Sequence, residues 1–497
     1  MRVPTPFAVV AALALLASGS ANAAVESRSD PSTDSELVLL ISLSRHGSRA
    51  PNPSAKVHCP NNKANMESYS VPLEQLTERG MQQLEKTGRH IREVYVNEKG
   101  FLSPSFNGPE DEPHFEAYFR ADAANRCGQS AVSLGYGLYP KGTGPAGFEK
   151  QPIPVYMQLF ENEHDFTANG PCWGVMQEAN KKYAAGHAAT LIEEHKESLT
   201  AIADICGHNF FAGGDPVTAI KDVNDMFLFD QDEGLDPTPG LTPELTNDIT
   251  QLAFEHLIER LYSTPRQITT AIGGFPQLLV RNLNEGAAPI RSPESIKYLS
   301  YHGHRELMHG LGFMMGMKFN FEGLPEFNGS TPLHPGTTLF FELHRSPIKS
   351  DSTTNPSSAP PTYEYFVQLF VWSPLSPRTA VKLDNCEMNC PLAEFTAIID
   401  SHIQATGAWQ DICNYHPVNV PVKSVNVAVK DATIIESKSL KQDPALLEES
   451  ADSQEVALFS GMRTLWLLLA AGGFAAMGAV GATTYHQFME RRGYQSL

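Results

Sequence analysis

The residues best suited to chemistry lie in one short loop near the start of the chain. A histidine stands between two arginines in the run Arg45-His46-Gly47-Ser48-Arg49, and Ala50-Pro51 follow. Two guanidinium groups a few residues apart can donate paired hydrogen bonds to the oxygens of one phosphate, and a neutral imidazole can attack phosphorus. The loop therefore predicts a phosphate site in which Arg45 and Arg49 bind oxygens and His46 is the nucleophile.

The segments around this loop must position it. The apolar run 37–43 directly before it predicts a buried strand, and Gly47 and Pro51 mark a tight turn and an exit. Further along, Thr77 is a candidate N-cap for a helix whose apolar residues recur with mainly helical spacing. These residues are Leu84, Ile91 and Val94.

Arg-His-Gly-x-Arg-x-Pro resembles the signature of the histidine acid phosphatase family, a branch of the histidine phosphatase superfamily. The helix after Thr77 and the segment 119–131 resemble family segments as well. The resemblance implies a third phosphate-binding arginine at Arg126 and a structural role for Arg120. It covers roughly Leu37 to Cys413 and looks closest to the membrane-bound, lysosomal type of acid phosphatase.

The family places a second histidine, usually followed by Asp, at the end of a later core strand. Of the two histidines between Lys297 and Glu306, His304 agrees better than His302 with the residues on either side. Arg305 then occupies the usual Asp position. Glu306 is the natural replacement, as in the His-Ala-Glu motif of the inositol polyphosphate phosphatase branch.

Other roles for these residues stay open. Glu306 is alternatively a solvated carboxylate at a helix N-terminus. His302 and His309 are expected to support the site from behind or to lie on the surface.

The residue types predict hydrolysis of a phosphomonoester through a phosphohistidine on His46. The three arginines and a protonated His304 would hold the phosphoryl oxygens, while Glu306 protonates the leaving oxygen and then activates water. An unperturbed His titrates near ~6.5 and a Glu near ~4.3, so a charged His304 and a protonated Glu306 coexist only in acid. No cofactor is expected, and no His, Asp or Glu cluster has the sequence spacing of a metal site.

Short apolar segments interleaved with helical patterns predict an α/β protein. The strands are expected near residues 37–43, 153–160, 299–302, 338–343 and 365–371. The resemblance implies a phosphoglycerate-mutase-like core sheet flanked by helices. The stretch at about 173–276 has mainly helical and polar patterns, and we expect it to form a cap over the site that sets substrate preference.

The two ends of the chain predict a membrane protein of the secretory pathway. Residues 1–23 have the basic start, short apolar core and small-residue exit of a signal peptide cleaved after Ala23. Residues 463–485 predict a transmembrane helix, because 464–483 carry no charge and are long enough to cross a bilayer. Arg491 and Arg492 favour a cytoplasmic tail at 486–497, hence type I topology with 24–416 luminal or extracellular. The polar stretch 417–462 would be a stem.

The tail suggests where the protein resides, and the overall charge indicates which partners are disfavoured. Tyr494-Gln495-Ser496-Leu497 resembles sorting signals in which clathrin adaptors bind Tyr494 and Leu497 in two apolar pockets. This predicts endosomal or lysosomal membranes or the cell surface, the alternative being a tail that nothing recognises. A net charge of -19 argues against nucleic-acid partners. A homodimer is a candidate assembly.

Seven cysteines in a secretory protein predict disulfides with one thiol left over, although sequence alone does not set the pairing. By resemblance, the expected pairs are Cys386 with Cys390 and Cys172 with Cys413. Cys127 is the candidate free thiol, which leaves Cys59 and Cys206 as a weaker third pair. Asn328-Gly329-Ser330 is a predicted glycosylation site.

Three functions remain open at this stage. The first is a broad-specificity acid phosphatase. The second is an inositol polyphosphate phosphatase of the phytase kind, suggested by His304-Arg305-Glu306, although the cap region is rich in Asp and Glu rather than basic residues. The third is a catalytically impaired phosphate-binding ectodomain that lost its acid when Arg305 took the place of Asp.

Overall fold

The computed structural model describes residues 35–166, 170–213, 216–288, 295–348 and 362–416. The expected signal peptide (1–23), stem (417–462), transmembrane helix (463–485) and tail (486–497) lie outside these ranges. Among the residues that are described, no helix combines the length and apolar character needed to cross a membrane.

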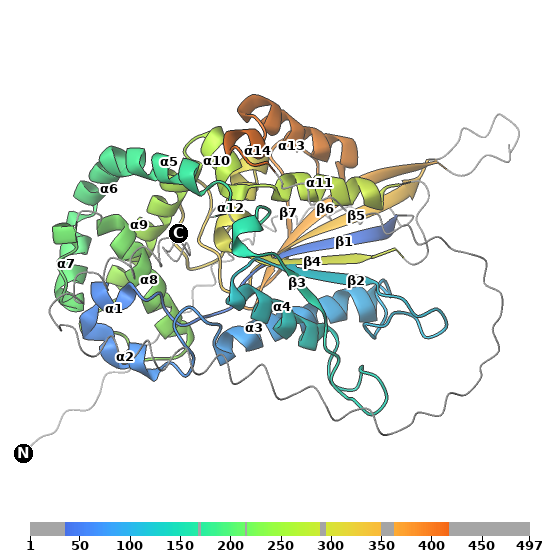
Figure 1. Ribbon diagram of the computed structural model, residues 1–497, viewed down its shortest axis with the longest axis horizontal. Coiled ribbons are helices and arrows are strands. Elements are labelled where there is room, and N and C mark those ends of the chain that lie inside the picture. Colours follow the sequence, from blue (N-terminus) through green and yellow to red (C-terminus); the bar gives the residue numbers. More distant parts are fainter. Residues whose placement is uncertain (1–34, 167–169, 214–215, 289–294, 349–361, 417–497) are drawn as a thin grey trace, which may run out of the picture.

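A mixed β-sheet forms the centre of the protein, as Figure 1 shows. Its strands lie in the order β3-β2-β4-β1-β5-β6-β7, and β8 pairs with β6. Strands β1 to β4 are parallel and β5 to β8 are antiparallel to their neighbours. Because parallel strands end at the same edge, the loops after β1, β2 and β4 meet there. The strands are β1 (Glu36–Arg45), β2 (Ala117–Ala121), β3 (Val155–Met157), β4 (Tyr298–Gly303), β5 (Thr338–Pro347), β6 (Tyr363–Ser373), β7 (Ser376–Val381) and β8 (Cys390–Pro391).

The five predicted strands all exist, and one is shorter than expected. Of the apolar run 153–160 only β3 pairs, because Pro152 and Pro154 cannot donate to a ladder and a 3₁₀ turn starts at Phe160. Strands β2, β7 and β8 were not predicted. In β7 the side chains alternate between partly buried and exposed for most of its length, so the strand lacks a continuous apolar run.

Helices cover both faces of the sheet (Figure 1). On one face α3 (Glu78–Ile91) and α4 (Asn125–Leu138) pack over Leu40 of β1. The other face carries α11 (Phe275–Gly286), α12 (Arg305–Met315), α13 (Leu392–Thr406) and α14 (Trp409–Ile412), against Leu39, Ile41 and Leu43. Burial on both faces explains the uninterrupted apolar sequence of β1. Thr77 caps α3 as predicted, since its Oγ1 accepts a hydrogen bond from the Gly80 N–H at 3.1 Å.

The remaining helices gather at the end of the sheet that lies to the left in Figure 1. From Tyr183 in α5 to Leu252 in α9 their apolar residues form a separate core with residues of α1 and α2, whereas Met176 in α5 packs into the core of the sheet. From Phe254 onward the chain packs into the core of the sheet, so only part of the segment 173–276 has a core of its own. The helices are α1 (Ala55–His58), α2 (Lys63–Ser68), α5 (Trp173–Ala185), α6 (His187–Glu194), α7 (Lys196–Cys206), α8 (Pro216–Asp232), α9 (Pro243–Tyr262) and α10 (Pro265–Ile272).

Helix α8 is held to the loops of the sheet domain by buried polar contacts. Asp222 accepts hydrogen bonds from Asn52 at 2.9 Å and from Ser54. Asp230 accepts hydrogen bonds from Asn62 and from Tyr69, both at 2.7 Å. These bonds set the position of α8 above the loop that follows β1.

The structure contains disulfides Cys59–Cys206, Cys172–Cys413 and Cys386–Cys390, the same pairs that the sequence analysis expected. The first joins the segment between α1 and α2 to the end of α7. Cys127 is a buried free thiol, also as expected. Asn328 is exposed in a turn with a positive φ of 52°, and its glycosylation stays a prediction.

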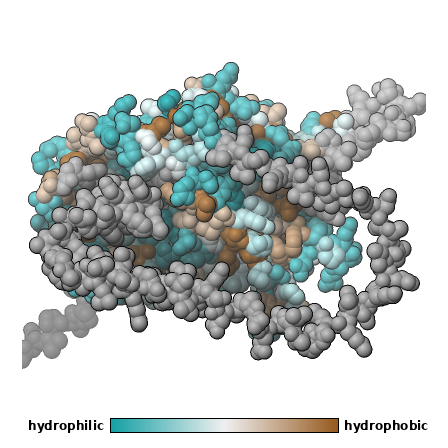
Figure 2. Space-filling model, viewed as in Figure 1, coloured by the Kyte–Doolittle hydropathy of each residue, from teal (hydrophilic) through white to brown (hydrophobic). Residues whose placement is uncertain are grey.

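The edge of the sheet at β3 exposes apolar side chains. Tyr156, Met157 and Leu159 are 54%, 41% and 71% exposed. In the view of Figure 2, hydrophobic residues gather near the middle of the face, where β3 lies in Figure 1. The parallel side of the sheet therefore ends in an apolar edge strand.

We expect Gly88→Ala to destabilise the protein by roughly 1 to 3 kcal/mol, because α3 and α4 cross with backbone in contact. A Cβ on Gly88 would lie 2.0 Å from the Leu134 carbonyl oxygen, and one on Gly137 would lie 2.0 Å from that of Glu85. The free energy of unfolding from denaturant titration measures the effect.

Gly174→Ala is the matched control. Gly174 lies in α5 with open space where its Cβ would be, so alanine should stabilise the helix by up to about 1 kcal/mol. Equal effects of the two substitutions would contradict the close helix crossing.

Candidate active site

Backbone hydrogen bonds hold the loop after β1 at the edge of the sheet. The His46 N–H donates to the Gly303 carbonyl at the end of β4 at 3.0 Å, and the Gly336 N–H donates to the His46 carbonyl at 3.1 Å. The Asp122 N–H donates to the His302 carbonyl at 2.9 Å and so places the residue after β2 beside the same edge. The loop with His46 thus lies where three strands end.

The glycine of the signature is required by a close approach to helix α3. A Cβ on Gly47 would lie 2.3 Å from the Gly80 carbonyl oxygen, and one on Gly80 would lie 2.0 Å from the Ser48 carbonyl oxygen. The Ser48 N–H donates to Gln83 Oε1 at 2.8 Å. The first turn of α3 is therefore in backbone contact with the loop and fixes the conformation of the loop.

His46 has the protonation state of a nucleophile. Its Nδ1 lies 2.8 Å from the Gly47 carbonyl oxygen, which can only accept, so Nδ1 carries the proton and Nε2 keeps its lone pair. Burial, together with the charges of Arg126, His304, Arg45 and Arg49, lowers the pKa of His46 well below its usual value. His46 is therefore neutral in mildly acidic conditions.

The three predicted phosphate-binding arginines surround His46 closely enough to act on its pKa. Nε of Arg45, of Arg49 and of Arg126 is buried and has no hydrogen-bond partner among the described residues. Burial, with smaller contributions from neighbouring charges, lowers the pKa of Arg45 to about 9 and that of Arg49 to about 10. Buried cationic donors without partners favour binding of an anion.

Arg120 differs from these three in having carboxylate partners. Its guanidinium lies 3.3 Å from Glu163 and 2.6 Å from Asp165. These ion pairs agree with the structural role that the resemblance implied.

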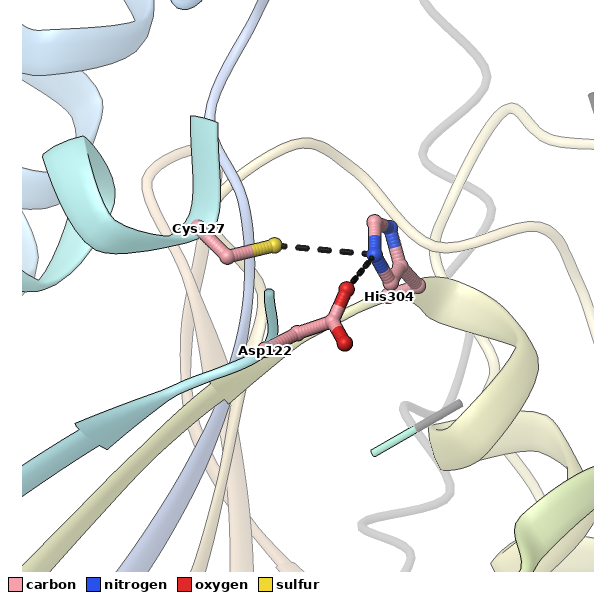
Figure 3. A group of neighbouring side chains, drawn as sticks. All are labelled: Asp122, Cys127 and His304. Atoms are coloured by element: carbon pink, nitrogen blue, oxygen red, sulfur yellow. Dashed lines mark hydrogen bonds and ion pairs between the residues drawn. The ribbon is translucent and has the colours of Figure 1, made fainter. Parts of the chain in front are cut away.

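His304 is the second histidine of the site. It is the N-cap residue of α12, directly after β4, and its ring centroid lies 5.3 Å from that of His46. Figure 3 shows Asp122 and Cys127 pointing at the same ring nitrogen: Asp122 Oδ2 lies 2.7 Å and Cys127 Sγ 3.6 Å from His304 Nε2. Burial opposes protonation, but Cys127 and Asp122 outweigh it and raise the pKa of His304 to about 10.

His302 and His309 do not reach the site. His302 is fully buried, and its Nε2 hydrogen-bonds Ser300 Oγ at 2.9 Å. His309 packs between Phe254 and Phe319. Burial lowers the pKa of each to about 3, so both are neutral core histidines, and the expectation of a surface position is wrong.

Arg305, at the position where the family usually has Asp, is part of a buried ion-pair network. Its Nη1 and Nη2 donate to the two carboxylate oxygens of Asp225 in α8, at 2.8 and 3.0 Å. Its Nε lies 3.3 Å from Glu306 Oε1. The guanidinium is therefore engaged by the protein itself and is less available to a phosphate than those of Arg45, Arg49 and Arg126.

Glu306 has a different protonation state from the one that unperturbed values predict. Burial would raise its pKa, but the positive charges of Arg305, His304 and Lys221 outweigh burial and hold that pKa well below the usual range. Without substrate, Glu306 is thus ionised even in acid. The expected acidic pH range in which a charged His304 coexists with a protonated Glu306 is wrong for the protein alone, because that expectation ignored the cations around the carboxylate.

Three residues of the site were not predicted. Asp122 and Cys127 contact His304, and Asp225 binds Arg305. Asp122 could have been identified from the sequence, because it lies in the same short segment as Arg120 and Arg126. Spacing along the chain indicated no metal-ligand cluster, but the fold brings together ligand atoms of Asp122, Cys127 and His304, which all lie within 4.8 Å of one another.

We expect Asp122→Asn to lower the pKa of His304 by about 1 to 3 pH units. The carboxylate stabilises the imidazolium, so its loss lets the proton leave at lower pH. An NMR titration of isotope-labelled histidine in both proteins measures the change. Asp165→Asn is the control, because Asp165 pairs with Arg120 and not with His304; unchanged titration in the Asp122 variant would contradict the assignment.

Comparison with known proteins agrees with this geometry. The profile of the histidine phosphatase superfamily (branch 2) matches residues 36–371, which include every residue of the site. A Caenorhabditis elegans protein named "Putative acid phosphatase 10" is 44% identical over 68 residues, which are 14% of this chain. The match spans only 15% of that relative's length.

Solved structures share the fold at low sequence identity. The apo form of Hafnia alvei phytase superposes with a TM-score of 0.54 at 17% identity, covering 76% of this chain and 99% of that one. Klebsiella sp. ASR1 phytase gives a TM-score of 0.54 at 14% identity, covering 76% and 98%. Citrobacter braakii phytase gives 0.52 at 19% identity, covering 74% and 98%. The chain belongs to branch 2 of the histidine phosphatase superfamily.

Proposed function

We propose that this hydrolase is an acid phosphatase that cleaves phosphomonoesters through a phosphohistidine on His46. One observation carries the proposal. Three arginines whose Nε groups are buried and unpartnered among the described residues surround a histidine whose Nε2 is free to attack. Such a pocket suits a tetrahedral anion whose phosphorus faces the imidazole.

In the first step His46 Nε2 bonds to phosphorus as the bond from phosphorus to the leaving oxygen breaks. Arg45, Arg49 and Arg126 stabilise the charge on the phosphoryl oxygens, and the imidazolium of His304 donates to one of them. In the second step water attacks the phosphohistidine, and inorganic phosphate and neutral His46 are regenerated.

Glu306 transfers the proton in both steps. Glu306 is ionised in the protein alone. A bound phosphate adds negative charge beside it and offsets the positive charges of Arg305 and His304, so the pKa of Glu306 rises. In acid a phosphomonoester carries one proton, since its second pKa is about 6. We infer that Glu306 receives this proton in the complex, passes it to the leaving oxygen, and then accepts one from the attacking water.

The protonation states of the two histidines support acidic working conditions. His304 stays charged throughout the acidic and neutral range because its pKa is raised to about 10. His46 stays neutral well below its usual pKa. A charged His304 and a neutral His46 therefore coexist at a pH where the substrate phosphate still carries its proton.

Charge on the cap side favours small phosphomonoesters over inositol polyphosphates. Lys221 Nζ lies 3.4 Å from Asp222 and 3.9 Å from Asp225, and Asp225 also binds Arg305. These two cations beside the site are thus neutralised by carboxylates and are less available to additional phosphates. Phytase-like activity is the second candidate, supported by the His304-Arg305-Glu306 order and by the shared fold of the phytases.

The test is an assay of the purified luminal part, residues 24–416, on p-nitrophenyl phosphate and on myo-inositol hexakisphosphate at acidic pH. We expect turnover of the first and weak or no turnover of the second. Preference for the second would favour the phytase-like function. Inactivity on both, with inorganic phosphate bound in calorimetry, would identify a phosphate-binding ectodomain instead.

We also propose that the protein is anchored by residues 463–485 as a type I membrane protein, with Tyr494 and Leu497 as its sorting signal. The basis is the uncharged stretch and the tail sequence. Extraction of the full chain into alkaline carbonate would contradict the anchor. Unchanged surface levels of Tyr494→Ala would contradict the signal.

A further inference from the structure

A group of three potential metal ligands lies at the back of the proposed phosphate site. Asp122 follows β2, Cys127 lies in the first turn of α4 and His304 follows β4. Their ligand atoms lie within 4.8 Å of one another, as Figure 3 shows. Carboxylate oxygen, thiolate sulfur and imidazole nitrogen are the ligand types that zinc prefers.

The geometry suits a tetrahedral ion. Zn–N and Zn–S bonds of about 2.1 and 2.3 Å imply a nitrogen-to-sulfur separation of roughly 3.6 Å. Cys127 Sγ lies 3.6 Å from His304 Nε2. Asp122 Oδ2 lies 2.7 Å from the same nitrogen, closer than the roughly 3.4 Å of a tetrahedral zinc site, so the carboxylate must rotate to bind the ion.

Asp122 also has a carboxylate oxygen that makes no hydrogen bond to the described residues. Its side chain is 4% exposed, and Oδ1 is buried without a hydrogen-bond partner among the described residues. A buried carboxylate oxygen in this state is stabilised by a cation. Cys127 is fully buried and is the one cysteine of the described chain outside a disulfide, so its sulfur is available as a ligand.

The occupied site carries no net charge. A zinc ion bound by a neutral imidazole, a carboxylate and a thiolate sums to zero, and the ligand protons that it displaces pass to solvent. The neighbouring arginines therefore meet no additional net positive charge.

We propose that Asp122, Cys127 and His304 bind Zn²⁺ reversibly and that the bound ion inhibits the enzyme. The ion takes the place of the proton that His304 Nε2 shares with its two neighbours. The ring is then a neutral imidazole, whose remaining Nδ1–H is a weaker donor to a phosphoryl oxygen than the imidazolium, so turnover falls. Inhibition rests on the proposed phosphatase function, whereas metal binding does not.

Cobalt binding tests the site independently of activity. Co²⁺ added to the wild-type protein should produce a thiolate-to-cobalt charge-transfer band, and Zn²⁺ should abolish it by displacement. Cys127 alone can give this band among the described cysteines, because the other six are in disulfides. A wild-type protein without the band at saturating Co²⁺ would overturn the proposal, whether or not it is a phosphatase.

Two variants assign the ligands. Cys127→Ser should lose the band and weaken zinc affinity by at least about 10-fold, whereas Asp122→Asn should keep the band and weaken cobalt and zinc affinity. Thermal unfolding shows whether each variant is folded, and Mg²⁺ is the control ion because it prefers oxygen ligands. Zinc affinity of folded Cys127→Ser equal to that of wild type would refute the site. Metal binding without any phosphatase activity in wild type would reject the proposed function alone.

Discussion

His46→Ala is expected to lower kcat/KM for p-nitrophenyl phosphate on the order of 10⁴-fold or more, because a missing covalent nucleophile cannot be replaced by positioning. The arginines would still bind phosphate, so affinity for inorganic phosphate should change little. Steady-state kinetics and calorimetry measure the two effects. In wild type, rapid denaturation during turnover should trap phosphate on His46, which mass spectrometry of the peptide detects.

His187→Ala is the control for this substitution. Its side chain is 57% exposed in α6 and pairs with Glu259, away from the site. It should keep normal activity. A His46 variant that turns over at close to the wild-type rate would show that the nucleophile is another group.

The second large effect is expected for Glu306→Gln, which should slow alkyl phosphates by about 10²- to 10⁴-fold. Aryl phosphates with good leaving groups should be slowed far less, since their oxygens need little protonation. Comparing kcat for p-nitrophenyl phosphate and glycerol phosphate in the same variant makes the first substrate an internal control. The amide keeps the shape of the side chain, and Arg305 keeps its paired bonds to Asp225.

An equal loss on both substrates would assign Glu306 to positioning rather than proton transfer. No loss on the alkyl substrate would point to another acid. Arg305→Ala is a poor control, because it leaves the carboxylate of Asp225 without its main partner in a buried setting, at a cost of about 3 to 5 kcal/mol.

Much of this protein could be predicted from local sequence. The uninterrupted apolar run of β1, the Thr77 cap of α3 and the alternation of strands and helices are properties of neighbouring residues. The His46 loop is also local, because the proposed nucleophile and two of the three arginines, Arg45 and Arg49, come from one turn. Recognition of His304 and of the Cys172–Cys413 pair depended on resemblance to a family, since the residues that they meet are distant in sequence.

The sequence by itself determined the α/β class and the His46 loop, and resemblance to the family added the choice of His304 over His302. The tertiary structure alone decided which charges surround each group. Asp122 and Cys127 reach His304 from 182 and 177 residues away, and Asp225 reaches Arg305 across 80 residues. Residues so far apart in sequence come into contact only because strands β2 and β4 end at one edge of the sheet and α8 packs above that edge. Because Coulomb energy depends on separation in space, the protonation states of His304 and Glu306, and the metal ligands, could not be predicted from order along the chain.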